Sequence, residues 1–232
     1  MSAVQGPVLV VVAHPDDETL GCGATMAALA DRSVDVSTCI LCAGAGARRH
    51  RPEDDELRAD TELAHSLLGA RVAAWGAFPN IELNTVPHLE LVQFIEAALA
   101  ETGARTVFTH HPQDLNDDHL YTARACQAAA RLFQRRAGVP PLEALYFMEV
   151  LSSTDWAFPG TAEPFRPDAF FEVGASGVAR KLDALSAYRG VMRPYPHPRS
   201  APAVEGLAAL RGAQAGVDRA EAFQTVFHRL SP

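Results

Sequence analysis

The sequence predicts a single three-layer α/β/α domain with a Rossmann-like, mainly parallel sheet. The first observation is the continuous apolar, mostly β-branched run at residues 8–13, because strands covered on both faces have this composition. The second is the alternation of such runs with helical segments up to residue 150. The third is that acidic, histidine-containing segments directly follow two of these runs, where open parallel sheets bind ligands.

Apolar runs and turn residues place the individual elements. We expect buried strands at residues 8–13, 34–43, 72–75, 106–109 and 145–150. Apolar residues at helical spacing predict helices at residues 21–31, 56–68, 89–99, 121–136 and 178–188. Gly69 is placed to end the second of these helices. A proline-punctuated loop at residues 193–198 and a final pair of helical segments complete the chain.

Length and composition limit the domain organisation. A chain of 232 residues with 48% hydrophobic residues has enough apolar surface for one sizeable core. We therefore expect residues 1–232 to form one domain. Residues 151–232 begin with a turn-rich stretch and contain several prolines, which indicates a covering subregion that determines substrate specificity, not an independent domain.

Charge and cysteine content exclude several classes of function. The formal net charge of -8 argues against binding to nucleic acids or anionic membranes, so the expected partner is a small molecule. The sequence contains no segment typical of a signal peptide or a membrane span, and we expect a cytoplasmic protein. Cys39 and Cys42 match a C-x-x-C pattern but lie in an apolar run, which predicts buried core cysteines. Lys181 is the single lysine and stands in a helical segment, so no Walker-type loop is predicted.

The segment from Ala13 to Glu18 carries the strongest functional signal. His14 and Asp17 are three residues apart on a predicted strand-to-helix turn, so their side chains can converge on one point. A third metal ligand must come from elsewhere, and the best source is the segment from His110 to His119, which also lies between a buried strand and a helix. One carboxylate and two imidazoles, completed by water, form an open catalytic zinc site.

These two segments resemble the zinc-dependent N-acetylglucosaminyl deacetylases known as LmbE-like or PIG-L deacetylases. The resemblance rests on Ala-His-Pro-Asp-Asp-Glu at residues 13–18, and on His-Pro and Asp-His at residues 111–112 and 118–119. It implies that His14, Asp17 and His119 bind zinc or another divalent metal. It also implies that Asp16 is the base that deprotonates the zinc-bound water, which then attacks an amide carbonyl.

The resemblance extends to residues around this centre. Many members of the family carry a histidine, thought to stabilise the oxyanion, where this chain has Asn116. The loss of one oxyanion donor costs about 2.7–4 kcal/mol. His197, in a loop that resembles a sugar-modifying branch of the family, is our candidate substitute. Asp118 either orients a catalytic partner or caps a helix. Asp114 either forms a hydrogen bond to the ring of His14 or His119, or caps a helix.

Three further residues are candidates for substrate binding. Arg58 matches an arginine of the family and suits a polyhydroxylated or anionic substrate. Arg48 belongs to a basic cluster that follows the second predicted strand and can meet an anionic group. Trp156 can stack on a sugar ring. Each of these residues is also compatible with a purely structural or solvent-exposed role.

The expected reaction is hydrolysis of an N-acetyl group from an amino sugar or sugar conjugate, and by analogy with the family we expect a homo-oligomer. Two alternatives stay open: an amidase of the same family that acts on a larger acyl group or a thiol conjugate, and a relative that binds sugars without turnover. A magnesium-dependent phosphotransfer receiver is disfavoured, because it needs a lysine at a later strand end and has no use for His14.

Overall fold

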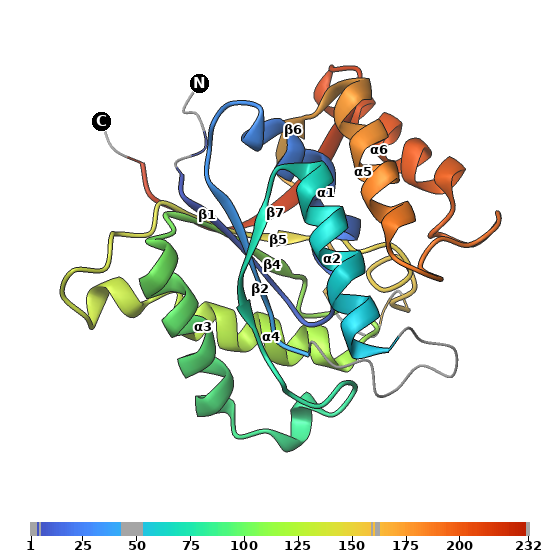
Figure 1. The fold of residues 1–232 in the computed structure, drawn as a ribbon. Helices are drawn as coiled ribbons and strands as arrows, with labels where there is room; N and C mark the ends of the chain where they lie inside the picture. Colours follow the sequence, from blue (N-terminus) through green and yellow to red (C-terminus); the bar gives the residue numbers. More distant parts are fainter. Residues whose placement is uncertain (1–3, 5, 43–52, 159, 161–162, 231–232) are drawn as a thin grey trace.

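A mostly parallel sheet forms the centre of the molecule (Figure 1). The computed structural model describes residues 4, 6–42, 53–158, 160 and 163–230. Within these residues seven strands pair in the order β3-β2-β1-β4-β5-β7-β6. Their bounds are β1 Val8–Val12, β2 Val36–Ile40, β3 Arg71–Trp75, β4 Thr106–His110, β5 Ala144–Met148, β6 Ala169–Glu172 and β7 Ala220–His228. The first five strands are parallel, whereas β7 runs antiparallel to both β5 and β6.

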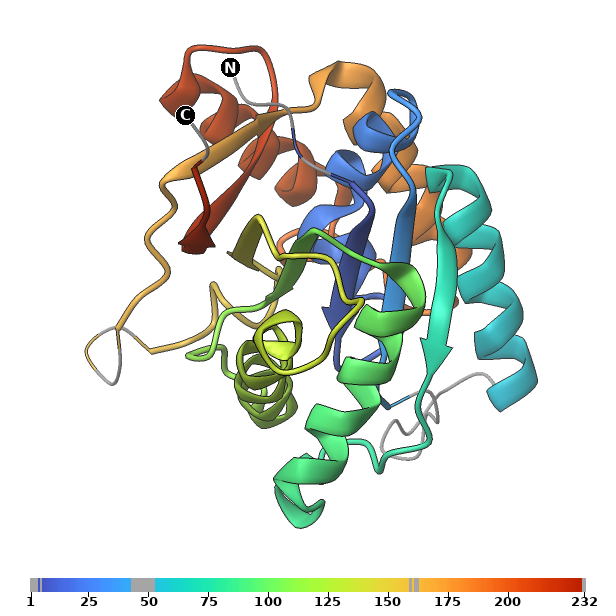
Figure 2. The ribbon, with the colours of Figure 1, turned by 90° about the vertical axis from the view of Figure 1, so that its left-hand side faces the viewer.

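Helices cover both faces of this sheet (Figures 1 and 2). Their bounds are α1 Asp17–Ala30, α2 Asp54–Leu68, α3 His88–Thr102, α4 Asp117–Ala129, α5 Gly174–Ala187 and α6 Ala201–Ala215, with short 3-10 turns η1 Leu83–Thr85 and η2 Leu132–Gln134. Helices α1, α2, α5 and α6 lie on one side, and α3 and α4 on the other. The predicted three-layer fold is therefore confirmed. No helix among the described residues is long and apolar enough to cross a bilayer.

The continuous apolar character of β1 follows from its central position. Successive side chains of a strand point to opposite faces. Val8, Val10 and Val12 pack into the core beneath α1 and α5, whereas Leu9 and Val11 pack into the core beneath α3. Every residue of β1 is buried, so both faces of this strand favour apolar side chains.

The pairing of β1 with β4 brings the two candidate segments together. The strands are parallel neighbours, with Val11 opposite Thr109. Immediately beyond the pairing, the backbone N–H of Ala13 donates to His110 Nε2 at 2.8 Å. Parallel neighbours end at the same edge of a sheet, so the residues that follow β1 and β4 must lie side by side.

A buried ion pair supports helix α1 behind this edge. The helix is interrupted at Cys22, whose backbone angles are not helical. Lys181 Nζ donates to the backbone oxygen of Leu20 at 2.7 Å, and the backbone N–H of Thr25 donates to the Glu221 carboxylate at 2.7 Å. Lys181 and Glu221 are themselves 2.6 Å apart. The pair thus provides partners for backbone groups at the interruption.

The structure corrects part of the prediction for the C-terminal third. Of the final pair of helices, only the first is present, as α6; residues 220–228 form strand β7. Strand β6 was not predicted either. Both strands owe their conformation to antiparallel pairing with distant residues, which local periodicity does not reveal. The helix predicted at residues 121–136 begins earlier, at Asp117, and ends at Ala129.

We expect removal of Lys181 to destabilise the protein strongly. Lys181→Met leaves Glu221 buried without its cation, a change that typically costs about 3–5 kcal/mol. The neighbouring variant Arg180→Met is the control, because it also removes a cation from α5. Arg180 pairs with Asp31 and donates to the backbone oxygens of Leu67 and Ala27 at more exposed positions, where an ion pair contributes at most about 1 kcal/mol. Urea unfolding of both variants measures the difference. Equal losses of stability would contradict a supporting role for the buried pair.

Candidate functional site

The turn between β1 and α1 presents three candidate functional side chains. His14 and Asp16 belong to the turn, and Asp17 is the first residue of α1. Asp16 has a backbone φ of 107°, which is strained for a residue with a side chain, and its N–H donates to Glu18 Oε2 at 3.1 Å. The Asp16 carboxylate does not cap α1. Its interactions therefore lie elsewhere in the site.

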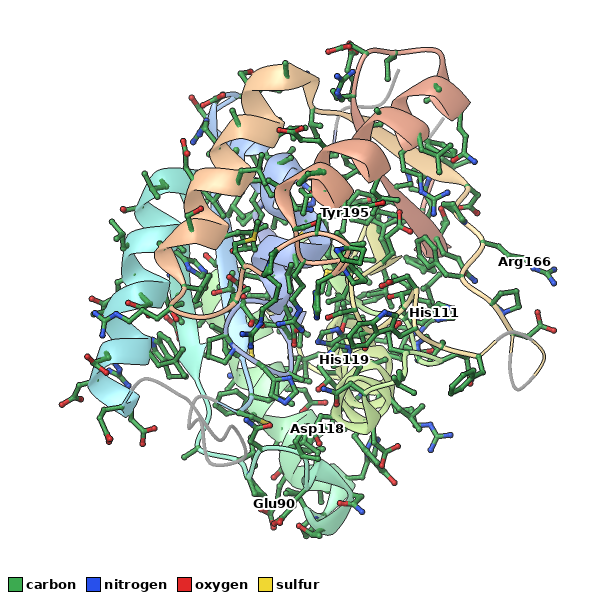
Figure 3. The ribbon with its side chains drawn as sticks, turned by 90° about the vertical axis from the view of Figure 1, so that its right-hand side faces the viewer. Glu90, His111, Asp118, His119, Arg166 and Tyr195 are labelled. Atoms are coloured by element: carbon green, nitrogen blue, oxygen red, sulfur yellow. The ribbon has the colours of Figure 1, made fainter. Side chains whose placement is uncertain are left out.

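Two imidazoles from different segments meet at the Asp17 carboxylate. His14 Nδ1 and His119 Nε2 each lie 3.2 Å from Asp17 Oδ2. The backbone N–H of His14 donates to the same oxygen at 3.0 Å. His119 lies in the first turn of α4, beside Asp118 (Figure 3). The three side chains are buried, so one carboxylate and two imidazoles face one another out of contact with bulk water.

Each imidazole directs its second nitrogen to another aspartate. His14 Nε2 lies 2.9 Å from Asp118 Oδ2, and His119 Nδ1 lies 2.8 Å from Asp114 Oδ2. In metal sites this arrangement fixes the orientation and tautomer of a ligand histidine. Asp118 thus contacts a candidate ligand ring and does not cap a helix with its side chain.

The two outer aspartates are held in turn by their own donors. Asp118 accepts backbone hydrogen bonds from Ile81 to Oδ2 at 2.6 Å and from Leu83 to Oδ1 at 3.0 Å. Asp114 Oδ1 accepts the Thr154 hydroxyl at 2.6 Å. The loop after β3 and the segment after β5 therefore both help to hold the centre.

The electrostatics of the cluster favour positive charge. Burial acts to lower the pKa of His14, but its contacts with Asp118 and Asp17 raise the pKa overall. Burial is likewise the largest influence on His119, yet the charge of Asp17 and further carboxylate contacts raise its pKa to about 10. Against the effect of burial, the imidazoles hold the pKa of Asp17 well below its usual range. His110, which stacks on His119 with ring centres 3.7 Å apart, has a pKa well below normal because it is buried.

The donor set at Asp17 is compatible with a divalent metal. His14, Asp17 and His119 each offer one ligand atom, and these atoms lie within 4.8 Å of one another. Among the described residues, His119 Nε2 is buried and makes no hydrogen bond of acceptable geometry, although Asp17 is near. Two imidazole nitrogens and a carboxylate oxygen are ligands that zinc prefers. The residues therefore fit the ion that the sequence predicts.

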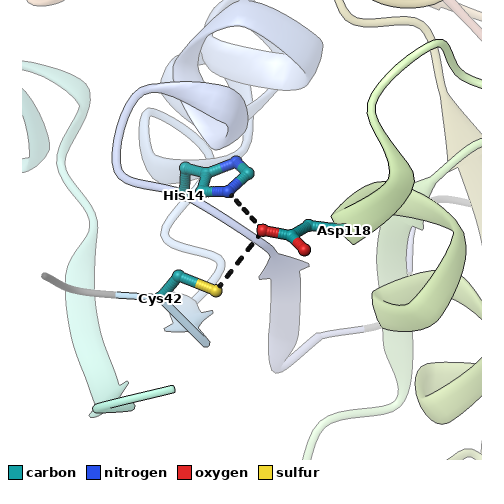
Figure 4. Close-up of side chains that lie close together, drawn as sticks. All are labelled: His14, Cys42 and Asp118. Carbon is teal, nitrogen blue, oxygen red and sulfur yellow. Dashed lines mark hydrogen bonds and ion pairs between the residues drawn. The ribbon is translucent and has the colours of Figure 1, made fainter. Parts of the chain in front are cut away.

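A second group of potential ligands shares His14 with this centre (Figure 4). It consists of His14, Cys42 and Asp118, with Cys42 Sγ 3.9 Å from Asp118 Oδ2. That oxygen already accepts a hydrogen bond from Ile81 and contacts His14 Nε2, and burial raises the pKa of the Cys42 thiol. We therefore interpret this group as a hydrogen-bonded support of His14. Cys39 and Cys42 are buried and not paired in a disulfide, as the apolar run predicts.

Asn116 acts locally as the N-cap of α4. Its Oδ1 accepts the backbone N–H of Asp118 at 3.0 Å, and its own N–H donates to Ser153 Oγ at 3.3 Å. The cap explains why α4 begins at Asp117, earlier than predicted. The cap also fixes the first turn of α4, which carries Asp118 and His119.

The predicted outer residues lie at different places. The His197 ring packs edge-on against Trp156, with ring centres 5.2 Å apart. His197 Nδ1 accepts the backbone N–H of Arg199. Arg58 stacks over Trp75 at the end of β3, 5.0 Å from the ring centre. Arg48 lies outside the described residues.

Arg199 is a site residue that the sequence analysis missed. Its Nη1 lies 3.3 Å from Asp16 Oδ2, and its Nε donates to Ser152 Oγ at 2.6 Å. The loop with His197 does reach the centre, but the contact with Asp16 comes from the residue two positions later. The sequence signal for this residue is a cation two positions after His197 in the same loop.

Comparison with known proteins identifies the family. A family model described as "PIG-L: GlcNAc-PI de-N-acetylase" matches residues 9–130, more than half of the chain. The chain belongs to the PIG-L family. The predicted resemblance is thereby confirmed, and membership in a deacetylase family supports a hydrolase. A relative, the uncharacterized deacetylase YaiS of Escherichia coli K12, is 25% identical over 193 residues, and the match covers 78% of this chain and 90% of YaiS.

Solved structures share the fold of this PIG-L protein. The conserved protein TT1542 of Thermus thermophilus matches with a TM-score of 0.77 and 28% identity over 97% of this chain and 96% of its own. The N,N'-diacetylchitobiose deacetylase of Pyrococcus horikoshii matches with a TM-score of 0.74 and 19% identity, over 94% of this chain and 83% of its own. GalB, the 4-carboxy-2-hydroxymuconate hydratase of Pseudomonas putida KT2440, matches with a TM-score of 0.76 and 20% identity, over 97% of this chain and 98% of its own. At identities of 20% and below, the likeness establishes the fold alone.

We expect loss of the Asn116 cap to destabilise the protein modestly. Asn116→Ala removes the acceptor for the Asp118 N–H and should lower the free energy of unfolding by about 1 kcal/mol. Asn116→Ser keeps a capping oxygen and should retain most of the stability. Urea unfolding compares the variants. If alanine and serine are equally tolerated, the cap does not contribute as described.

Proposed function

We propose that this PIG-L protein is a zinc-dependent hydrolase that removes an N-acetyl group from an amino sugar or sugar conjugate. The single observation that carries the proposal is the convergence of His14 Nδ1 and His119 Nε2 on one carboxylate oxygen of Asp17. A carboxylate and two imidazoles leave a coordination position for water, as hydrolytic zinc sites require. Family membership supports amide hydrolysis.

In this proposal His14, Asp17 and His119 hold the metal, while Asp118 and Asp114 fix the two imidazole rings. Zinc, when bound, acts as a Lewis acid and lowers the pKa of a coordinated water to about 7. The nitrogen ligands favour zinc over magnesium or calcium, which prefer oxygen ligands. The neighbouring aspartates keep both rings oriented, so binding requires little rearrangement of the side chains.

Asp16 is the proposed proton carrier. Its carboxylate is buried and belongs to the residue before Asp17, and in the proposal it serves the reacting water and is not needed as a metal ligand. Asp16 accepts the proton of the water that attacks the amide carbon. It then returns that proton to the amine nitrogen as the carbon–nitrogen bond breaks. The products are acetate and a free amine.

The outer residues belong to the proposed substrate-binding side. Trp156, with His197 packed against it, offers an aromatic face to a sugar ring. Arg58 and Arg48 remain candidates for contacts with hydroxyl or anionic groups of the substrate. We assign residues 151–232 to substrate specificity within a single domain of residues 1–232. Asn116 remains a candidate for contact with the reacting amide, in addition to its capping role.

The first test separates metal binding from proton transfer. Asp16→Asn preserves the size of the side chain, and asparagine also tolerates the positive φ at this position. It should retain zinc but lose amine release about 10²–10⁴-fold, because the proton carrier is missing. His119→Ala is the control that should lose zinc as well. Metal analysis and a free-amine assay over a panel of N-acetylated sugars, with larger acyl groups included, provide both readouts. An Asp16→Asn protein that holds zinc and is fully active would disprove the mechanism.

A second test concerns His197. If it acts on the chemical step, either directly or by holding the backbone N–H of Arg199, His197→Ala should lower kcat on the best substrate of the panel. If it only supports Trp156, KM should rise with kcat unchanged, because an aromatic contact with the sugar is weakened. Steady-state kinetics distinguish the two results. Wild-type kcat and KM in His197→Ala would remove this residue from the site.

A further inference from the structure

Arg199 connects three segments that are distant in sequence. It lies at the end of the loop before α6, its Nε donates to Ser152 Oγ at 2.6 Å, and its Nη1 lies 3.3 Å from Asp16 Oδ2. The Asp16 side chain is fully buried, and that of Arg199 is 21% exposed. A guanidinium with several fixed donors is thus anchored on one side and directed to a buried carboxylate on the other.

Asp16 is a residue that needs such a contact. Its φ of 107° is strained, and strain of about 1–3 kcal/mol persists only where the surroundings hold the backbone. Glu18 holds its backbone N–H from one side, and Arg199 contacts its carboxylate from another. Burial of a carboxylate is also unfavourable unless charged or polar groups compensate it.

The position of Arg199 is itself fixed by the loop. Its backbone oxygen accepts the N–H of Arg193 at 2.9 Å, and its own N–H donates to His197 Nδ1 at 3.0 Å. The His197 ring packs on Trp156, which lies in the same loop as Ser152. The loops at residues 151–157 and 193–200 therefore contact each other, and together they hold the Arg199 guanidinium in position.

We propose that Arg199 is a positioning residue, which holds the Asp16 carboxylate where it can exchange a proton with the reacting water and amine. This inference rests on the proposed function of Asp16. It assigns a new task to the loop at residues 193–200: the loop acts on proton transfer through Arg199. The assignment differs from substrate recognition, which would require Arg199 to be directed to a ligand.

The test uses full-length protein loaded with zinc. In Arg199→Gln the carboxylate of Asp16 loses its anchor, so kcat should fall about 100-fold while KM stays within about threefold. Arg199→Lys keeps the positive charge but lacks the several fixed donors of the guanidinium, so its kcat should lie between those of Arg199→Gln and the wild type. Added guanidinium at low millimolar concentration should also restore part of the activity of Arg199→Ala, whose short side chain leaves room for the ion. Ser152→Gly, which suits the positive φ of 68° at that position, should give a smaller loss of kcat.

Arg193→Gln is the matched control, because it removes the same charge from an exposed side chain of the same loop. It should leave kcat and KM unchanged. A crystal structure of Arg199→Gln provides a readout without turnover, in which Asp16 should occupy more than one side-chain position. A loss confined to KM, an equal loss in Arg193→Gln, or a single unchanged Asp16 conformation would overturn the proposal. Wild-type protein that binds zinc but releases no amine would instead disprove the proposed function.

Discussion

The parallel pairing of β1 with β4 is the constraint on which the candidate site depends. His14 and Asp17 come from the turn and helix start after β1, and Asp118 and His119 come from the first turn of α4, which follows β4, so the site exists only while these two strands are neighbours. The bond from the Ala13 N–H to His110 Nε2 joins the ends of the strands directly. Because β1 is buried on both faces, the apolar cores above and below the sheet hold this pairing in place.

The site concentrates charged groups where burial opposes them. Asp16, Asp17 and Asp118 are all at most 2% exposed, and a buried carboxylate is tolerated only when hydrogen bonds or opposite charges surround it. Each is accordingly provided with partners: imidazoles at Asp17, a guanidinium at Asp16, and backbone N–H groups together with His14 at Asp118. In the proposed function the same carboxylates would attract the metal cation, so structural support and metal affinity would have one physical origin.

The parts of the site that sequence reasoning found are those encoded locally. The spacing of His14 and Asp17, and the strand that precedes each motif, follow from short-range patterns that the structure reproduces. Gly69 ends α2 in a left-handed conformation as predicted. Strand β7 was not found, because Glu221 and the alanines around it also suit a helix, and only pairing with β5 and β6 decides the conformation.

The direction of side chains in irregular loops also could not be predicted from the sequence. His197 was chosen for its chemistry, yet Arg199 is the residue of that loop whose side chain contacts Asp16. Asn116 looked like a lost oxyanion donor and proves to be a helix cap, a role compatible with any later contact through its amide nitrogen. Such outcomes depend on backbone angles of one or two residues and on packing against distant loops, which composition and spacing do not specify.

In the proposed function one divalent metal binds at Asp17. The most direct measurement is anomalous diffraction from zinc-soaked crystals, with data collected on both sides of the zinc absorption edge. We predict one strong peak bonded to His14 Nδ1, Asp17 and His119 Nε2. A peak among His14 Nε2, Cys42 and Asp118 instead, or no peak in protein whose fold is intact, would contradict the account.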